Sequence, residues 1–344
     1  MSAITFGLGQ FTLQIPPWDA RSPAELYADT LELAAFAESA GFDSFWLAEH
    51  HGSNDSYIPA LLPFLSAVAA RTTTLQIGTA VMLAPFHDPL RLAEDAAVVD
   101  NVSGGRLNLG LGLGWVPDEY RMFGVPMEGR GKRMEEIVEI LRQAWTGERF
   151  THTGRFYTFE DAAVTPRPAH HIPILLGGAA ELAIERAAVM GDGHVSASTT
   201  TLEAVVETAG KIAAIRRERG VAGPYRFGCF MPAGFGDDEA QAWASIRDGV
   251  LHVRGSYVTW SMGGRDVANA RDTAAQWEDA NRANAVLGTP AQVAERLKGI
   301  VEGLASAGFD DIVLSVGLAP PGTPLERAKR AVETFAEKVV PALR

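Results

Sequence analysis

Residues 40–51 read Ala40-Gly41-Phe42-Asp43-Ser44-Phe45-Trp46-Leu47-Ala48-Glu49-His50-His51. A glycine directly after a helical-period segment is typical of a helix end, because glycine adopts the left-handed conformation that closes a helix. The apolar run that follows has the length of a strand, and polar side chains come directly after it. The stretch therefore predicts a helix-to-strand joint with polar groups at the carboxyl end of the strand.

The same joint recurs at Ala307-Gly308-Phe309-Asp310, and a looser version occurs at Gly191-Asp192-Gly193-His194. Apolar runs alternate with helical segments, and eight of the runs have strand length: 4–9, 42–48, 75–83, 106–114, 172–177, 193–198, 226–233 and 311–317. Most are almost continuously apolar, as expected for parallel strands that are buried on both faces. Eight strand-then-helix units in one chain favour an α/β fold, a (β/α)8 TIM barrel. An open doubly wound sheet is the alternative.

Helix starts between these strands carry clear signals. Ser22-Pro23-Ala24-Glu25 and Thr289-Pro290-Ala291-Gln292 both have the pattern of a capping box with proline at the first helical position. Asp88-Pro89 opens a further helix in the same way.

Three segments depart from the regular spacing. A polar loop is expected between Trp115 and a helix near Met134, and residues 150–159 alternate like a small hairpin that turns at Gly154. An insertion of about 234–287 separates the seventh strand from the last capping-box helix. It carries the large side chains Trp243, Tyr257, Trp260, Met262 and Trp277. A long segment at the mouth of a barrel is typically a lid or pocket wall, and the alternative is a surface helical pair without a binding role. We expect one domain over residues 1–344.

Composition excludes several classes of function. The chain of 344 residues has 42 acidic and 30 basic side chains and a net charge of −12, which argues against a nucleic-acid partner. The single cysteine, Cys229, excludes an intramolecular disulfide and a thiolate zinc cluster. No apolar run reaches the roughly 18 residues of a membrane span. The N-terminus leads directly into the strand 4–9 rather than a signal sequence, so we expect a cytoplasmic protein with no membrane partner.

The candidate catalytic group is a histidine. His50 and His51 follow the second strand, where barrel enzymes carry their catalytic groups. Adjacent residues point to opposite faces, so at most one of the two is expected to face the mouth. A histidine there can act as a general base or hold a developing anion. The alternative is a pair of partly exposed polar residues at a strand end.

A metal site is not expected. Barrel hydrolases carry an alternating His-x-His pair on one strand, and this chain has none. His170 and His171 precede the fifth strand and therefore lie at its amino end. A metal-dependent hydrolase stays a minor alternative.

Two glycine-rich strand ends are candidate cofactor contacts. Residues 107–115 end in alternating glycines, which let a flat group lie against the backbone, although glycine also relieves crowding inside a barrel. The spacing is not a dinucleotide fingerprint, because Val116-Pro117 follows where a helix should open. Residues 172–180 form a strand, two glycines and a helix start, which together favour a phosphate site. The alternative is a tight turn without a ligand.

Taken together, the motifs resemble those of the bacterial-luciferase-like flavin-dependent monooxygenases. The resemblance is close over residues 1–200 and looser over 286–318, and residues 234–285 match no known pattern. It is carried by six stretches in order: 41–51, Leu75-Gln76-Ile77-Gly78-Thr79-Ala80-Val81, 88–95, Ser103-Gly104-Gly105-Arg106-Leu107, 110–124 and 173–178.

The resemblance implies FMN bound at the carboxyl mouth of a barrel, with His50 as the catalytic histidine. It also implies a non-prolyl cis peptide at Ala80-Val81, beside the flavin ring. The cofactor contacts that it implies are Thr79, Ala80, Val81, Leu113, Gly114, Trp115, Gly177, Gly178 and Ala179, the last three around the phosphate.

Some positions depart from the family pattern. Leu113 stands where the luciferase α chain has an arginine near the phosphate, and the Gly177-Gly178 turn lacks the family's Glu-Ser side chains. Arg130 and Arg133 are the candidate replacement cations. These departures keep open the related branch that transfers hydride with an 8-hydroxy-deazaflavin coenzyme. The string Glu49-His50-His51 favours FMN, because the deazaflavin branch has Asp-His at this point.

The resemblance thus implies a two-component monooxygenase. Reduced FMN would come from a partner flavin reductase, and molecular oxygen would oxidise a small organic substrate that is apolar or contains a carbonyl group. The family is commonly dimeric, so we expect a homodimer, with the alanine-rich helix 89–101 as a candidate contact. The alternatives are a deazaflavin-dependent oxidoreductase and a non-catalytic flavin-binding protein.

Overall fold

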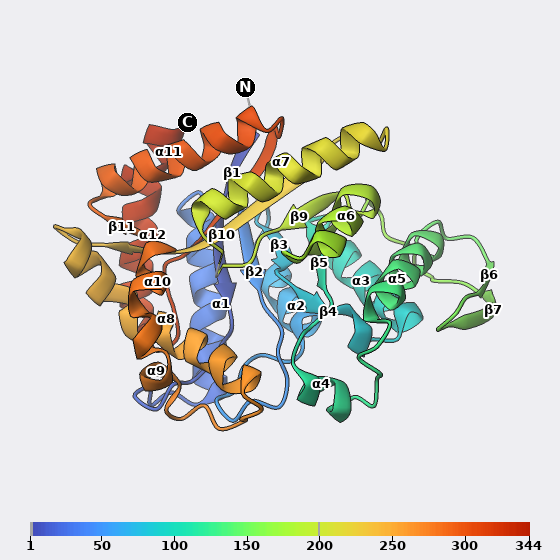
Figure 1. The fold of residues 1–344 in the computed structure, drawn as a ribbon, viewed down its shortest axis with the longest axis horizontal. Helices are drawn as coiled ribbons and strands as arrows, with labels where there is room; N and C mark the ends of the chain where they lie inside the picture. Colours follow the sequence, from blue (N-terminus) through green and yellow to red (C-terminus); the bar gives the residue numbers. More distant parts are fainter. Residues whose placement is uncertain (1–2, 199) are drawn as a thin grey trace.

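A closed barrel of eight parallel strands forms the centre of the molecule (Figure 1). The computed structural model describes residues 3–198 and 200–344. The barrel strands are, in spatial order, β1 (Ala3–Phe11), β2 (Ser44–Leu47), β3 (Gln76–Thr79), β5 (Leu107–Gly112), β8 (Ile174–Gly177), β9 (Gly193–Val195), β10 (Arg226–Phe235) and β12 (Asp311–Gly317). β12 pairs with β1 and closes the barrel. The predicted (β/α)8 fold is confirmed, and each of the eight predicted runs overlaps one barrel strand.

Side chains fill the inside of the barrel. Trp46, Leu175, Val195 and Phe230 form a buried cluster inside the barrel, and they come from β2, β8, β9 and β10. Gly78 makes room for the Trp46 ring, because a Cβ at this position would lie 2.2 Å from a ring carbon. The interior is therefore a packed core, and ligands can enter only at the ends of the strands.

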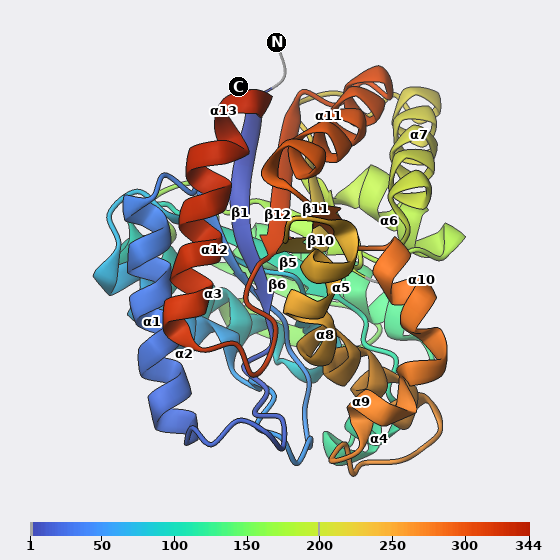
Figure 2. The same ribbon diagram turned by 90° about the vertical axis from the view of Figure 1, so that its left-hand side faces the viewer.

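Helices surround the barrel on the outside (Figure 2). They are α1 (Pro23–Ser39), α2 (Leu61–Arg71), α3 (Pro89–Ser103), α5 (Arg130–Ala144), α6 (Glu181–Met190), α7 (Leu202–Glu218), α11 (Pro290–Ser306), α12 (Leu325–Lys338) and the short α13 (Val340–Leu343). The capping boxes at Ser22 and Thr289 are both formed, and the Asp88 carboxylate accepts from two backbone N–H groups of α3.

Two predicted segments need correction. The run 75–83 is divided into β3 and a short strand β4 (Met82–Leu83), followed by the 3-10 turn η1 (Ala84–Phe86). The segment after Trp115, expected to be a loop, contains the helix α4 (Pro117–Met122), which starts at a proline with two acidic residues in its first turn. The predicted hairpin is confirmed as β6 (Phe150–Thr153) and β7 (Thr158–Ala162), which project from one side of the barrel (Figure 1).

The insertion is mainly helical. It contains α8 (Glu239–Ser261), α9 (Ala270–Thr273), η2 (Ala275–Trp277), α10 (Glu278–Ala283) and the short strand β11 (Val286–Gly288), which pairs with β10. α4 and α9 lie at the same end of the barrel in both views (Figures 1 and 2). One buried cluster packs the insertion against itself, and a second contact packs it against the main core. Trp243 packs with Ile246 and Leu251, whereas Trp260 packs into the main core.

The outer surface of the barrel does not decide whether the chain forms the expected homodimer. α3 exposes Val98 and Val102, each about half accessible, so the homodimer contact through this helix stays a prediction. Within the described residues, every helix falls short of the length or apolar character that crossing a membrane requires.

Candidate active site

A cavity of about 550 Å³ lies at the carboxyl ends of the barrel strands. Its volume falls in the range of roughly 300–1,000 Å³ that is typical of cofactor and small-molecule sites. The cavity brings together most of the predicted site residues, which are His50, Ala80, Val81, Leu113, Gly114, Trp115, Gly177, Gly178 and Ala179. Thr79 does not line it; the Thr79 hydroxyl is buried and donates to the Gly110 carbonyl at 2.7 Å.

His50 is oriented by a carboxylate. Its Nδ1 lies 2.9 Å from Glu119 Oε1 on α4, and the same oxygen accepts from the backbone N–H of His51 at 2.8 Å. An ionised carboxylate can only accept, so this contact places the ring proton on Nδ1. Nε2 has no partner in residues 3–198 and 200–344, and it is the nitrogen left for a ligand in the cavity. His51 is turned away from the cavity, as the alternation of side chains predicts.

Aromatic side chains enclose the His50 ring. The ring centroids of Trp260, Tyr57 and Tyr257 lie 4.7, 5.1 and 5.2 Å from that of His50. The Tyr57 and Tyr257 hydroxyls are 3.3 Å apart, and burial raises the pKa of both phenols, so both stay protonated at neutral pH. The His50 ring therefore lies among aromatic side chains, two of which carry protonated hydroxyl groups.

A second buried network lies beside His50. Glu49 Oε1 lies 2.7 Å from His51 Nε2 and 3.1 Å from His87 Nε2, and Oε2 accepts from the Leu83 backbone N–H at 3.2 Å. Burial alone would raise the pKa of Glu49, but the hydrogen bonds from the two histidines outweigh it and lower the pKa to about 2. Burial would lower the pKa of His87, and the bond to Glu49 instead raises it.

We expect Glu49→Gln to lower the free energy of unfolding by about 3 kcal/mol at neutral pH, because it leaves the buried His51 and the partly exposed His87 without their carboxylate. Since the Glu49 pKa drops from 4.5 to about 2, its contribution is present above pH 4.5 and is lost as the pH falls toward 2. The raised pKa of His87 adds a contribution that is present at low pH and lost as the pH rises through that pKa. Urea unfolding from pH 2 to 8 measures both. Glu333→Gln, at an exposed site on α12, is the control. An unchanged unfolding free energy in Glu49→Gln would contradict the assigned network.

The glycines of β5 let two backbone segments approach closely. A Cβ on Gly112 would lie 2.4 Å from Val81 Cγ2, and one on Gly110 would lie 1.9 Å from the Thr79 carbonyl oxygen. The Ala80-Val81 peptide is cis, as the family resemblance implied, and the Gln10 side-chain amide donates to the Ala80 carbonyl. Gly110 and Gly112 therefore relieve crowding inside the barrel, whereas Gly114 lines the cavity.

The turn after β8 has the features of an anion site. Gly178 has a φ of 129°, and Ala180, the N-cap of α6, provides no side-chain hydrogen bond to the first helical N–H groups. These groups and the positive end of the helix dipole are available to a phosphate. Arg130 at the start of α5 lines the same cavity. Arg133, the other candidate cation, lies 4.4 Å above the Phe156 ring on the hairpin and does not line the cavity.

Sequence reasoning missed three residues of the site. Gln10 directly follows the first predicted strand, 4–9, so its position at a strand end could have identified it as a site residue. Glu119 is 69 positions from His50 along the chain, in a segment expected to be a loop. Arg254 lies on α8, in the insertion where the sequence motifs alone show no family resemblance, and also lines the cavity.

The carboxyl mouth of this (β/α)8 barrel carries a cofactor-sized cavity and an oriented histidine, which is where barrel enzymes have their active sites. The model of the luciferase-like monooxygenase family matches residues 9–307. The match includes residues 234–285, so the expectation that this segment lies outside the family pattern is wrong. The chain therefore belongs to the luciferase-like monooxygenase family.

Individual relatives agree with this assignment. An uncharacterized protein of Sinorhizobium fredii, y4vJ, is 33% identical over 57% of this chain and 55% of its own length. The chain thus spans about half the length of this relative. Limonene 1,2-monooxygenase of Rhodococcus erythropolis is 27% identical over 98% of this chain and 87% of its own length.

Solved structures share the whole fold. The monooxygenase RslO1 from Streptomyces bottropensis has a TM-score of 0.79 and 26% identity, covering 99% of this chain and 100% of its own. Two more distant structures carry cofactors. The oxygenating constituent of 3,6-diketocamphane monooxygenase from Pseudomonas putida, in complex with FMN, has a TM-score of 0.76 at 18% identity, covering 99% of both chains. An F420-dependent secondary alcohol dehydrogenase with an F420-acetone adduct has a TM-score of 0.77 at 20% identity, also covering 99% of both chains. At 18% and 20% identity, these two similarities show that the fold is shared and do not determine the cofactor of this chain.

Proposed function

We propose that the chain is a monooxygenase that binds reduced FMN at the barrel mouth and uses molecular oxygen to oxidise a small organic substrate. The observation that carries the proposal is that one cavity contains both an anion site, at Gly177–Ala180 with Arg130, and a histidine held by a carboxylate. Membership of the luciferase-like monooxygenase family supports it. The substrate class that follows from the family is a small apolar or carbonyl-containing molecule.

The residues present fit FMN. The uncapped start of α6 and the Arg130 guanidinium would hold the phosphate, because both supply positive charge and N–H donors to one end of the cavity. Val81, Gly114 and Trp115 would lie along the flat ring system, where small side chains and an aromatic surface leave room for it. Bound reduced FMN supplies the electrons for the reaction with oxygen.

The protein would supply orientation, exclusion of water and proton transfer. His50 Nε2 holds or moves a proton, while Glu119 fixes the orientation of the ring from the opposite side. Tyr57, Tyr257 and Trp260 keep water away from the ring, which strengthens electrostatic interactions there. α8 forms one wall of the cavity through Arg254, Tyr257, Val258 and Ser261, and we propose that the insertion closes over the substrate.

The second candidate is hydride transfer with an 8-hydroxy-deazaflavin coenzyme. The similar fold of the F420-dependent alcohol dehydrogenase keeps this candidate open. FMN is favoured by Glu49 before His50, where the deazaflavin branch has aspartate. A non-catalytic flavin-binding protein is the third candidate, and the oriented His50 argues for chemistry instead. A separate flavin reductase as partner and a homodimer in the cytoplasm belong to the proposal.

Arg130→Met tests the cofactor site. We expect it to weaken binding of reduced FMN by about 10- to 100-fold, because a charge-assisted hydrogen bond to phosphate is lost. Binding of reduced riboflavin, which has no phosphate, should change by less than about twofold, within measurement error. Anaerobic fluorescence titration measures both affinities.

Arg133→Met is the matched control, since it removes the same charge from the same helix outside the cavity. An equal loss of riboflavin binding in Arg130→Met, or a larger loss of FMN binding in Arg133→Met, would show that the phosphate is held elsewhere.

A further inference from the structure

The Arg254 side chain lies at the boundary between two cavities. It lines the large cavity beside His50 and also a second cavity of about 120 Å³. The second cavity lies against the carboxyl ends of β1, β10 and β12, and its walls are largely apolar, with Leu13, Leu26, Leu33, Phe230 and Met231 among them. Gln10 and Tyr257 are shared with the large cavity, so the two spaces adjoin.

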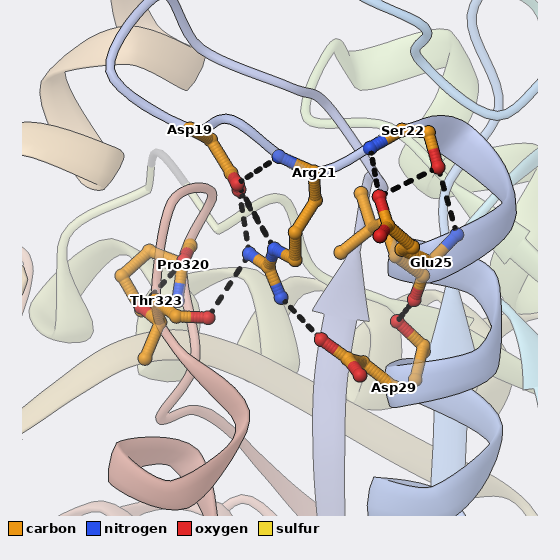
Figure 3. Close-up of polar contacts among 9 residues, drawn as sticks. Asp19, Arg21, Ser22, Glu25, Asp29, Pro320 and Thr323 are labelled. Atoms are coloured by element: carbon orange, nitrogen blue, oxygen red, sulfur yellow. Dashed lines mark hydrogen bonds and ion pairs between the residues drawn. The ribbon is translucent and has the colours of Figure 1, made fainter.

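Arg254 has no hydrogen bond or ion pair to any residue in the described part of the chain. In contrast, Arg21, the other arginine that lines the smaller cavity, has several acceptors (Figure 3). Arg21 forms ion pairs with Asp19 at 2.5 Å and Asp29 at 3.0 Å, and it donates to the Thr323 carbonyl at 3.1 Å. A partly buried guanidinium without any acceptor is costly, so Arg254 is available to a ligand anion.

The acidic side chains that line the two cavities already have ion-pair partners. Glu49 is held by His51 and His87, and Asp29 is held by Arg21. Glu119, which lies behind His50, accepts from that ring and from the His51 backbone. The ion pairs of these three carboxylates are all with residues other than Arg254.

Arg130 and Arg254 come from different helices, α5 and α8, and of these two arginines Arg254 alone also lines the smaller cavity. Arg130 lines the large cavity together with the ends of β5 and β8, whereas Arg254 lies by the ends of β12 and β1. In the closed strand order, two strands separate β8 from β12 and two separate β1 from β5. Because the phosphate of the proposed cofactor is assigned to Arg130 and the start of α6, a second anionic group would supply the partner that Arg254 lacks.

We propose that the substrate is an organic acid whose carboxylate pairs with Arg254 between the two cavities. The inference rests on the proposed function, because the oxidisable carbon must then lie in the large cavity, beside His50 and the flavin. Arg254 and Tyr257 lie one turn apart on the same face of α8, and the Tyr257 ring is 5.2 Å from the His50 ring. A carboxylate held by Arg254 thus lies close to the reaction centre, and the smaller cavity accepts an apolar part of the substrate.

The test compares octanoate with its neutral analogue octanamide as probes. Calorimetric titration is made on the whole chain without flavin and again with FMN. We expect wild type to bind octanoate about tenfold more tightly than octanamide, and Arg254→Met to weaken octanoate binding by about 10- to 100-fold. Octanamide affinity should stay within about twofold of wild type, and Arg254→Lys should restore part of the octanoate preference. Arg217→Met, at an exposed site on α7, is the charge-matched control.

The inference is overturned by three results. One is a wild type without a preference for octanoate, and another is an equal loss in Arg217→Met. The third is a loss of FMN binding in Arg254→Met as large as that in Arg130→Met, which would make Arg254 part of the cofactor site. An octanoate preference that depends on Arg254 in a chain that binds no FMN would support this inference while removing the proposed cofactor.

Discussion

Replacing His50 with alanine is expected to lower substrate oxidation by about 100- to 10,000-fold, the range of a lost general acid or base. The physical reason is that Nδ1 is committed to Glu119, which leaves Nε2 as the ring nitrogen that faces the bound reactants. Affinity for reduced FMN should stay within about twofold, because the phosphate site lies on other strands. Product formation with reduced FMN and oxygen measures the rate, using a substrate that wild type oxidises in a screen that includes carboxylic acids.

Two controls distinguish a loss of catalysis in His50→Ala from a loss of folded protein. His171→Ala removes an exposed histidine whose Nε2 lies 3.4 Å from Asp192, outside the cavity, and it should keep the wild-type rate. Thermal unfolding of both variants checks that the barrel is intact. Full oxidation rates in folded His50→Ala would show that this histidine has no part in the reaction.

Asp55→Leu is expected to lower the free energy of unfolding by about 3–5 kcal/mol, because it leaves a buried charge network without its carboxylate. Asp55 Oδ2 lies 2.8 Å from Nε2 of His252 on α8 and accepts from the Gln14 amide at 2.6 Å. His252 is fully buried, so water cannot replace the lost partner. Since Asp55 follows β2 and His252 lies in the insertion, the substitution should detach α8 from the barrel mouth.

The pH dependence gives a second readout. Burial would raise the pKa of Asp55, but hydrogen bonds from His252, Ser53 and Gln14 lower it below 3.8. Its stabilising contribution is therefore present above the unfolded pKa and is lost as the pH falls through the folded value. Urea unfolding at pH 7 and pH 2 measures the change, with Asp237→Leu at an exposed position as the control. Equal stability of Asp55→Leu and wild type at pH 7 would contradict this account of how the insertion is held.

The barrel could be predicted from the sequence because its determinants are local. Apolar runs such as 106–114, glycine joints such as Ala40-Gly41 and capping boxes such as Ser22 to Glu25 each act within a few residues. His50 could be placed for the same reason, since a residue that follows a parallel strand lies at the mouth of a barrel.

The remaining parts of the site depend on contacts between distant segments. Glu119 lies on a helix of six residues, too short to give a periodic pattern, and its partner is 69 positions away. Arg130 and Arg133 are three positions apart on one helix, and only the position of the hairpin decides that Arg133 stacks on Phe156. The lack of an ion-pair partner for Arg254 depends on which side chains surround it, and no local sequence pattern in the insertion encodes that.

The most direct test of the central claim is an anaerobic titration of the purified chain with reduced FMN and, separately, with the reduced 8-hydroxy-deazaflavin coenzyme. Each complex is then mixed with oxygen labelled with the heavy isotope and with candidate substrates. We predict tight binding of reduced FMN, oxygen uptake, and one labelled oxygen atom in the product. Binding of the deazaflavin coenzyme alone, with hydride transfer and no oxygen uptake, would contradict the monooxygenase and make the chain a deazaflavin-dependent oxidoreductase.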